Sequence, residues 1–548
     1  MVHMQSKRAL TESNLFLSFL LVMSCLILLI PGISSYAILT QGDESMHIQT
    51  IRESFRNGNY FLPFLNGVPN PYKPPLIFWI GMAAESIVPE SLFMERLPSV
   101  LFAAGTAVLV FRISGIFGGQ RLASFTAGFI YILTVGVFKF SRLVMMEQAM
   151  AFFLSLCTYF ILMYIVHNRK KYIVLAGLCA GAGFLLKGPV LTVYAGTVLF
   201  VWGVLHFFRF RFAPFQWKGR KYLHRMLSGV LLFFIPAAFL PVLYYIVLTL
   251  YADNGIGIVK FFLFIENIGK FSNENQPELA IFLGAVFYLF PWSIAVSVLA
   301  FRLLFQRIRK PRALLGIILT VSSAFILLIH ILPNRKDAYY SIPALPLLIS
   351  GVFIKYGNYI YSFKNLWKMN AYFSLLILFL TVSGAFFLQT IDDFGISPFF
   401  SVAVLFMCGS VLFLKISYVY RNILVSFLIL AFFQFYLLRK TYLPLIPEDL
   451  NLGGKSVCIL SENSWNLFDA GIFLPGSRLY YSAPSLPENC PPDSPSLLAL
   501  GTHRTPDSRF EKKRSWKIWK PHSLVRDFLN RDRSRIFEEV SYYEIQNH

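Results

Sequence analysis

The stretch Thr40–Trp79, TQGDESMHIQTIRESFRNGNYFLPFLNGVPNPYKPPLIFW, is the polar segment around which the rest of the chain is arranged. It follows the first long apolar run, opens with the adjacent carboxylates Asp43 and Glu44, and closes with Lys73 before two prolines. Nearly everything after it is apolar sequence interrupted by short charged loops. This pattern predicts a loop at a membrane surface that carries half of an active site and is held in place by membrane helices.

The composition is that of a polytopic membrane protein. Of the 548 residues, 56% are hydrophobic and 14% are charged, whereas soluble domains have about 25% charged residues. Many apolar runs approach the ~20 residues that cross a bilayer. The net charge of +21 lies mainly in short loops between these runs, which is the pattern that sets membrane topology. It therefore argues for membrane lipids, and against nucleic acid, as the surroundings of the chain.

The basic residues also predict the orientation. Lys7 and Arg8 precede the apolar run Leu15–Ala37 and place the N-terminus inside. We interpret this run as a transmembrane helix and not a signal peptide, because its apolar core is long and further spans follow. The loop that begins at Asp43 is then outside. The short apolar stretch Pro75–Val88 fits the charge rule best as a helix on the outer surface.

We therefore predict a mostly α protein of about 13 transmembrane helices with surface helices in the first outer loop, residues 40–96. Twelve spans are expected after that loop: Leu97–Phe117, Leu122–Phe138, Met146–Val166, Ile173–Leu186, Val190–Phe208, Leu227–Tyr251, Leu279–Leu303, Leu314–Leu332, Ile342–Tyr356, Tyr372–Leu388, Pro398–Leu414 and Ile423–Leu438. An odd number of spans leaves the C-terminal end outside.

The chain is thus expected to divide into a transmembrane domain, 1–440, and a C-terminal domain, 441–548. The second is rich in Pro, Ser and Asn and is predicted to be a small extracytoplasmic α/β domain. Its basic stretch, 512–520, is interpreted as a solvated helix face, with docking to anionic lipid as the alternative, and Ser523–Phe537 as helical. The sequence leaves open whether Cys458 and Cys490 form a disulfide, which an oxidising compartment would permit.

The predicted topology gathers ionisable side chains on the outer face. Charged groups at membrane depth are costly and tend to be functional. Cations stabilise a departing phosphate, and a carboxylate orients or deprotonates an incoming nucleophile. This combination suits transfer of a group from a lipid-linked phosphate. The candidates are the carboxylates Asp43, Glu44 and Glu147, the cations Lys73, Lys187, Lys270, Arg335 and Lys336, and Tyr339.

Structural explanations compete with each of these functional ones. Acids in a first helical turn, such as Asp43 and Glu44, also stabilise the helix dipole. Lys73 also fits a side chain that snorkels to the interface. Arg335 is more informative because basic residues should be rare in an outer loop. His47 is interpreted as an interfacial histidine and not as a ligand.

Several segments, taken in order over residues 35–350, resemble the polytopic GT-C glycosyltransferases. Within these the chain looks like the family of the bacterial aminoarabinose transferase of lipid A and the related protein mannosyltransferase type. The matching segments are Gly42-Asp43-Glu44, Gly58-Asn59-Tyr60-Phe61-Leu62-Pro63, Leu65-Asn66-Gly67, Lys73-Pro74-Pro75-Leu76, Ser141-Arg142-Leu143 with Glu147, Leu186-Lys187-Gly188-Pro189, Phe290-Pro291-Trp292, and Arg335-Lys336 with Tyr339–Pro346.

The resemblance implies inverting transfer of a sugar from a polyprenyl-phosphate carrier, such as undecaprenyl phosphate, on the periplasmic side of the bacterial inner membrane. It implies catalytic roles for Asp43 and Glu147, which match the acids of the first and second outer loops. It implies lipid A as the acceptor. The positions expected near the carrier phosphate are Lys73, Lys187, Arg335 and Lys336, with Lys270 where relatives often have arginine.

Three departures leave the donor sugar open: Tyr72 replaces an acid, Asn267 replaces a histidine, and Glu147 replaces an aspartate. The main alternative is a protein O-glycosyltransferase that uses the same donor on a Ser or Thr hydroxyl. A lipid or solute transporter is the alternative from another class, although we see no internal repeat of the kind that transporters have. No metal-ligand spacing is present, and a divalent ion held by outer-loop carboxylates is left open.

Overall fold

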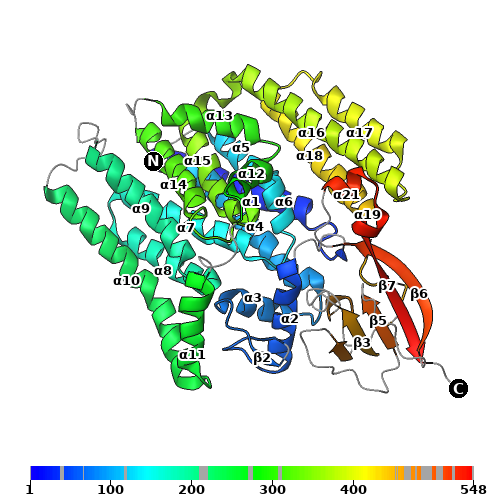
Figure 1. The fold of residues 1–548 in the computed structure, drawn as a ribbon. Coiled ribbons are helices and arrows are strands. Elements are labelled where there is room, and N and C mark those ends of the chain that lie inside the picture. The colour runs from blue at the N-terminus through cyan, green and yellow to red at the C-terminus, as the bar shows by residue number, and fades with distance from the viewer. Residues whose placement is uncertain are drawn as a thin grey trace.

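The computed structural model describes residues 2–36, 42–65, 67–116, 120–208, 220–269, 276–306, 311–447, 449–450, 452, 455–461, 471–474, 478–482, 496–500, 510–520 and 525–545. Within these ranges the chain is mostly helical, with a small sheet near the C-terminus (Figure 1). The predicted fold class, mostly α, is confirmed.

The first predicted outer loop forms two helices joined by a short hairpin. Its elements are α2 (Gly42–Arg56), β1 (Phe64–Leu65), β2 (Val68–Pro69) and α3 (Leu76–Glu85). Asp43 and Glu44 lie in the first turn of α2, where carboxylates favour the helix dipole. The two helices pack closely, because a Cβ at Gly81 would lie 2.2 Å from Cδ1 of Ile51. α3 occupies most of the predicted segment Pro75–Val88, and it is too short to be counted among the spans.

The helices that precede and follow this loop in the sequence form the helical bundle (Figure 1). Its first half contains α1 (Val2–Leu29), α4 (Leu92–Ser114), α5 (Arg121–Ile132), α6 (Val135–Phe140), α7 (Met146–His167), α8 (Lys170–Lys187), α9 (Val190–Phe208), α10 (Arg220–Tyr251), α11 (Gly255–Lys260) and the π-helix η3 (Phe261–Ile268).

Its second half contains α12 (Leu279–Leu289), α13 (Ser293–Leu304), α14 (Pro311–Ile329), the 3₁₀-helix η5 (Ala338–Ala344), α15 (Leu345–Tyr356), the 3₁₀-helix η6 (Gly357–Ser362), α16 (Lys364–Ile391), α17 (Pro398–Val411), α18 (Tyr418–Phe432), the π-helix η7 (Phe433–Leu437) and α19 (Leu438–Thr441).

The number of spans differs from the prediction. Each of the 13 predicted spans overlaps at least one helix of the described residues, and the chain is a multi-pass membrane protein. In the described part of the chain, however, seven helices are long and apolar enough to cross a membrane, or eight if the pair α12–α13, bent by 115°, counts as one. α5 and α6 show the reason: the helix breaks at Leu133–Thr134, and 12 residues of helix extend only ~18 Å, against ~30 Å of hydrocarbon. The count of 13 is not confirmed.

A mixed five-stranded sheet follows α19. Its strands are β3 (Ser456–Ser461), β4 (Arg478–Ser482), β5 (Ser496–Leu500), β6 (Phe510–Trp519) and β7 (Phe537–Ile545), in the spatial order β4-β3-β5-β7-β6. β3 is parallel to β4 and β5, whereas β7 is antiparallel to β5 and β6. Two short helices, α21 (Val525–Leu529) and α22 (Arg533–Ile536), precede β7.

This sheet corrects the interpretation of the basic stretch 512–520. The stretch is largely strand β6 and not a helix, because it pairs along its length with β7. The predicted helix Ser523–Phe537 is reduced in the described residues to α21 and α22. The boundary at 440/441 stays a prediction.

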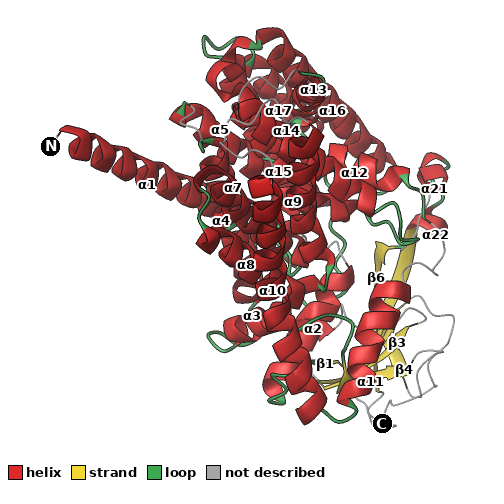
Figure 2. Cartoon of the chain, turned by 90° about the vertical axis from the view of Figure 1, so that its left-hand side faces the viewer, coloured by secondary structure: helices red, strands yellow, loops and turns green. Residues whose placement is uncertain are grey.

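The sheet lies against both the bundle and α2 (Figures 1 and 2). Trp519 of β6 stacks on Phe394 with ring centroids 5.4 Å apart. Lys517 donates to Asp392 at 3.2 Å, so this cation joins the sheet to the α16–α17 loop. On the other side, Phe473 contacts Tyr36 with centroids 4.6 Å apart.

The described cysteines include one in a disulfide bond and four free thiols. Cys458 of β3 is disulfide-bonded, and Cys490 lies outside the described residues. The cysteines in the helices, Cys25, Cys157, Cys179 and Cys408, are free thiols.

Candidate active site

A polar pocket opens where α2, the start of α7, the end of α8 and η5 meet. Six of its ten lining residues carry a carboxyl, imidazole, ammonium or guanidinium group. The lining residues are Asp43, His47, Lys73, Met145, Met146, Glu147, Lys187, Arg335, Tyr339 and Tyr340. Five distant parts of the sequence therefore converge, as the predicted topology requires.

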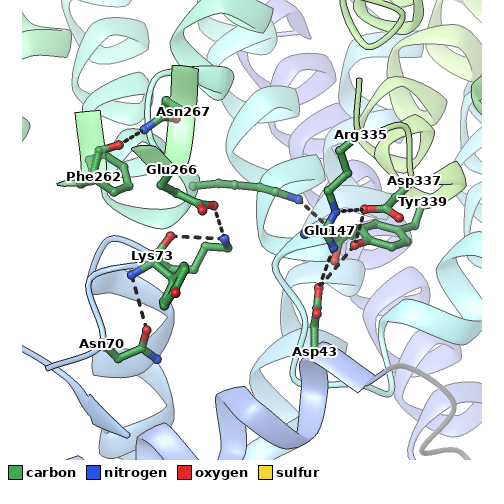
Figure 3. Close-up of polar contacts among 12 residues, drawn as sticks. Asp43, Asn70, Lys73, Glu147, Phe262, Glu266, Asn267, Arg335, Asp337 and Tyr339 are labelled. Atoms are coloured by element: carbon green, nitrogen blue, oxygen red, sulfur yellow. Dashed lines mark hydrogen bonds and ion pairs between the residues drawn. The ribbon is translucent and has the colours of Figure 1, made fainter. Parts of the chain in front are cut away.

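Asp43 stands at one side of the pocket and faces a cation and a phenol (Figure 3). Its Oδ2 lies 3.9 Å from Nη2 of Arg335 and 3.4 Å from the Tyr339 hydroxyl oxygen. The side chain of Asp43 is 26% exposed. These contacts are long and leave the carboxylate open to a substrate group.

Asp337 accepts hydrogen bonds from Arg335 and Tyr339, the two residues that lie beside Asp43. It accepts from Arg335 Nε at 2.9 Å and from the Tyr339 hydroxyl at 3.0 Å. Sequence reasoning did not select Asp337, although it follows Arg335 by two residues. Its position fixes the guanidinium and the phenol at the edge of the pocket.

Glu147 and Lys187 form a second pair. Lys187 Nζ donates to Glu147 Oε1 at 2.9 Å, with side-chain exposures of 18% and 2%. Lys187 also lies 4.8 Å from the ring centre of Tyr340, a cation–π contact. Among the described residues, Glu147 Oε2 has no hydrogen-bond partner. The pair comes from the first turn of α7 and the last turn of α8.

Lys73 connects the first loop to the π-helix η3. Its Nζ donates to Glu266 Oε1 at 2.5 Å and to its neighbouring carbonyl, Tyr72 O, at 3.2 Å (Figure 3). Asn267, on the same π-helix, donates to Phe262 O at 2.6 Å. Asn267 thus stabilises the π-helix beside the pocket.

His47 is a pocket residue that the sequence prediction placed at an interface. Its Nδ1 lies 3.0 Å from Val144 O. Since a carbonyl oxygen only accepts, Nδ1 carries the hydrogen and Nε2 is left as an acceptor. Within the described residues Nε2 has no partner. Burial lowers the pKa of His47 below its ordinary value of 6.5. The spacing Asp43-x-x-x-His47 on one helix was the available signal.

Two predicted residues in the described part of the chain do not line the pocket, and a third is not described. Glu44 is fully buried in an ion pair with Arg96. Lys336 is turned away from it, with Nζ 3.8 Å from Glu278 Oε1. Lys270 lies outside the described residues. No group of three or more His, Cys, Asp or Glu side chains in the described part of the chain could hold a metal ion.

The chain is similar to known proteins. The family "Dolichyl-phosphate-mannose-protein mannosyltransferase" matches residues 72–245. An undecaprenyl phosphate-alpha-4-amino-4-deoxy-L-arabinose arabinosyl transferase of Yersinia enterocolitica is 28% identical over 167 residues, which are 28% of this chain and 30% of that protein. An uncharacterized protein of Aquifex aeolicus is 25% identical over 332 residues, 59% of this chain and 71% of that protein.

The fold is similar over nearly the whole chain. The crystal structure of ArnT from Cupriavidus metallidurans bound to undecaprenyl phosphate matches with a TM-score of 0.63 and 13% identity, over 95% of this chain and 97% of that one. This chain is thus a polytopic protein with the fold of the GT-C glycosyltransferases, and the resemblance seen in the sequence is confirmed. Within that class it is similar to the aminoarabinose transferases and the mannosyltransferases.

Proposed function

We propose that this protein is a membrane glycosyltransferase that moves a sugar from a polyprenyl-phosphate carrier to lipid A on the periplasmic side of a bacterial inner membrane. The observation that carries the proposal is the pocket in which the open carboxylate of Asp43 lies beside Arg335 and which the cations Lys73 and Lys187 also line. The similarity to undecaprenyl phosphate-dependent transferases supports the donor class. Cys458 in a disulfide supports an oxidising compartment for the sheet.

The chemistry is a single displacement at the anomeric carbon of the sugar. An acceptor oxygen attacks that carbon and forms the new glycosidic bond while the bond to the carrier phosphate breaks, so the configuration inverts. The electron pair leaves on the phosphate oxygen. Lys73 and Arg335 stabilise that charge. Asp43 orients the acceptor or takes its proton, and Glu147 with Lys187 shapes the sugar side.

The acceptor decides how much base catalysis is needed. A lipid A phosphate is already ionised, so Asp43 then mainly orients it. A hydroxyl acceptor has to lose its proton, and general-base help is then worth ~10²–10⁴-fold. The identity of the sugar is tied to Tyr72, which contacts Phe261 with ring centroids 5.2 Å apart. An aromatic side chain at this position offers no carboxylate to a cationic amino sugar.

The alternative acceptor is a protein, and one observation favours it. The family matched over residues 72–245 is described as a protein mannosyltransferase. In that case Asp43 acts as a general base on a Ser or Thr hydroxyl, and the C-terminal sheet beside α2 helps to bind polypeptide.

The role of Asp43 is tested with Asp43→Asn in proteoliposomes that contain donor and acceptor. We expect sugar transfer to fall by at least ~10²-fold while the protein elutes and unfolds like the wild type. The matched control is Asp393→Asn, which removes an exposed acid in the α16–α17 loop. Near-normal transfer by Asp43→Asn would remove Asp43 from the mechanism.

The acceptor is identified by mass spectrometry of total lipid and glycoprotein from cells with and without the gene. A mass shift confined to lipid A supports the proposed acceptor. A shift confined to glycopeptides supports the alternative.

A further inference from the structure

A buried guanidinium lies apart from the pocket. Arg142, in the turn between α6 and α7, is 0% exposed. Its Nη2 donates to Pro31 O at 2.7 Å, and the guanidinium lies 4.9 Å from the ring centre of Phe138. Among the described residues, Nε and Nη1 have no hydrogen-bond partner. A buried cation without an ionic partner is costly, so an anion at this place would be favourable.

Two further polar side chains converge on the same point. A Cβ at Gly32 would lie 3.3 Å from Arg142 Nη2, 3.3 Å from Gln434 Nε2 and 3.8 Å from Arg439 Nη2. Gly32 has φ +71°, and its lack of a side chain lets these nitrogens approach one another. We call Arg142, Gln434 and Arg439 around Gly32 the Arg142 cluster. Within the part of the chain that is described, no carboxylate pairs with either of its arginines.

The electrostatics of the cluster also favour an anion. Burial lowers the pKa of Arg142 to about 9, with repulsion from Arg96 and Arg439 as further causes. Arg142 therefore remains a cation at pH 7. Arg96 is neutralised by Glu44, whereas the charges of Arg142 and Arg439 add to each other.

A narrow apolar pocket lies next to the cluster along the chain. Its lining comes from the same three segments that supply the cluster. Leu28 precedes Gly32 by four residues, Phe138 precedes Arg142 by four, and Leu430 precedes Gln434 by four, so the pocket and the cluster are close along each segment. The lining residues are Leu28, Ile132, Leu133, Phe138, Phe427, Leu430, Ala431 and Phe435.

We propose that the Arg142 cluster and this apolar pocket together bind an anionic phospholipid of the surrounding membrane. The phosphate diester lies against Arg142, Arg439 and Gln434, because one guanidinium group can bind two phosphate oxygens at once. One acyl chain lies over the apolar pocket, against the exposed rings of Phe427 and Phe435. None of these residues lines the pocket that contains Asp43, so the lipid site is separate and does not depend on the transfer reaction.

The test uses the full-length protein, delipidated in detergent and titrated with phosphatidylglycerol under native mass spectrometry. We expect the wild type to retain the lipid, and Arg439→Gln and Arg142→Gln each to weaken its affinity by about tenfold. The matched control is Lys440→Gln, which removes the neighbouring positive charge and should leave the affinity unchanged. Arg439 is exposed, so its variant decides the question even if Arg142→Gln does not fold.

Two further arms separate the lipid from its parts. Ala431→Phe fills the apolar pocket and should weaken phosphatidylglycerol binding with both arginines intact. Diacylglycerol with the same chains and inorganic phosphate should each bind more weakly than the phospholipid by at least tenfold. Equal affinity of the wild type and Arg439→Gln would overturn the proposal. So would diacylglycerol or phosphate binding as tightly as phosphatidylglycerol, or a polyprenyl phosphate copurifying at this site in its place.

Discussion

Two adjacent carboxylates in α2 have different environments. Asp43 reaches the pocket, whereas Glu44 accepts from Arg96 at 2.8 and 3.0 Å and from the Val144 backbone N–H at 2.8 Å. Successive residues on a helix point ~100° apart, so only one of the pair can face the pocket. Arg96 also donates to Ile33 O and Ser35 O. Glu44 therefore joins the end of the first helix, α4 and the second outer loop.

Glu44→Gln tests this structural role. It leaves the buried Arg96 without its ionic partner, and we expect the free energy of unfolding to fall by ~3–5 kcal/mol. Asp43→Asn, at a partly exposed site, should change stability little. Thermal unfolding of both variants in the same detergent makes the comparison. Equal melting temperatures for wild type and Glu44→Gln would contradict the assignment.

His47 predicts a pH dependence of stability. Its pKa is lowered in the folded protein, first by burial and further by the charge of Lys73, while Asp43, Glu147 and the Val144 carbonyl act in the opposite direction. Below pH 6.5 the unfolded chain binds a proton that folded His47 resists, so the free energy of unfolding falls as pH decreases. Above that pH the contribution is fully present.

The measurement is thermal unfolding between pH 7.5 and 5. The wild type should lose stability on the acid side. His47→Asn should lose less, because its amide can still donate to Val144 O and does not titrate. The interpretation fails if both proteins show the same loss.

At the scale of elements, α8 and α10 pack backbone to backbone. A Cβ at Gly177 would lie 2.3 Å from Phe233 O, and one at Gly181 would lie 2.9 Å from Ala237 O. The spacing Gly177-x-x-x-Gly181 is the small-residue pattern that lets membrane helices approach closely. This contact holds the end of α8, and with it Lys187, beside the pocket.

Gly177→Ala should therefore push the two helices apart. We expect a lower melting temperature and weaker transfer, since Lys187 shifts with α8. Gly384→Ala in α16 is the control, because no atom lies within 4 Å of its added Cβ and alanine favours helix by ~0.5–1 kcal/mol. Unchanged stability in Gly177→Ala would show that the helices tolerate separation.

Strand β6 shows the limit of local patterns. Its few apolar residues show no regular spacing that would distinguish a strand from a helix. The strand forms because β7, 18 or more residues later in the chain, pairs with it. Non-local pairing of this kind outweighs local preference.

At the scale of the whole molecule, the orientation is the prediction to test. From the basic residues of the loops we predict that the N-terminus lies in the cytoplasm and the C-terminal sheet in the periplasm. An epitope tag after His548 should be accessible on intact spheroplasts, and a tag at the N-terminus only after permeabilisation. A C-terminal tag that also requires permeabilisation would reverse the proposed topology or change the parity of the spans.

The sequence by itself determined that this is a multi-pass α-helical protein of the GT-C type and that Asp43, Lys73, Glu147, Lys187 and Arg335 belong together. Apolar runs, loop charges and short motifs are local features. In a membrane protein they predict which loops lie on the same face. Tertiary structure alone decided that Glu44 and Lys336 pair elsewhere, that His47 lines the pocket, that Asp337 binds Arg335 and Tyr339 beside it, and that Arg142 meets Arg439. These outcomes depend on which helix face is buried and on contacts between segments up to hundreds of residues apart, which no local pattern records.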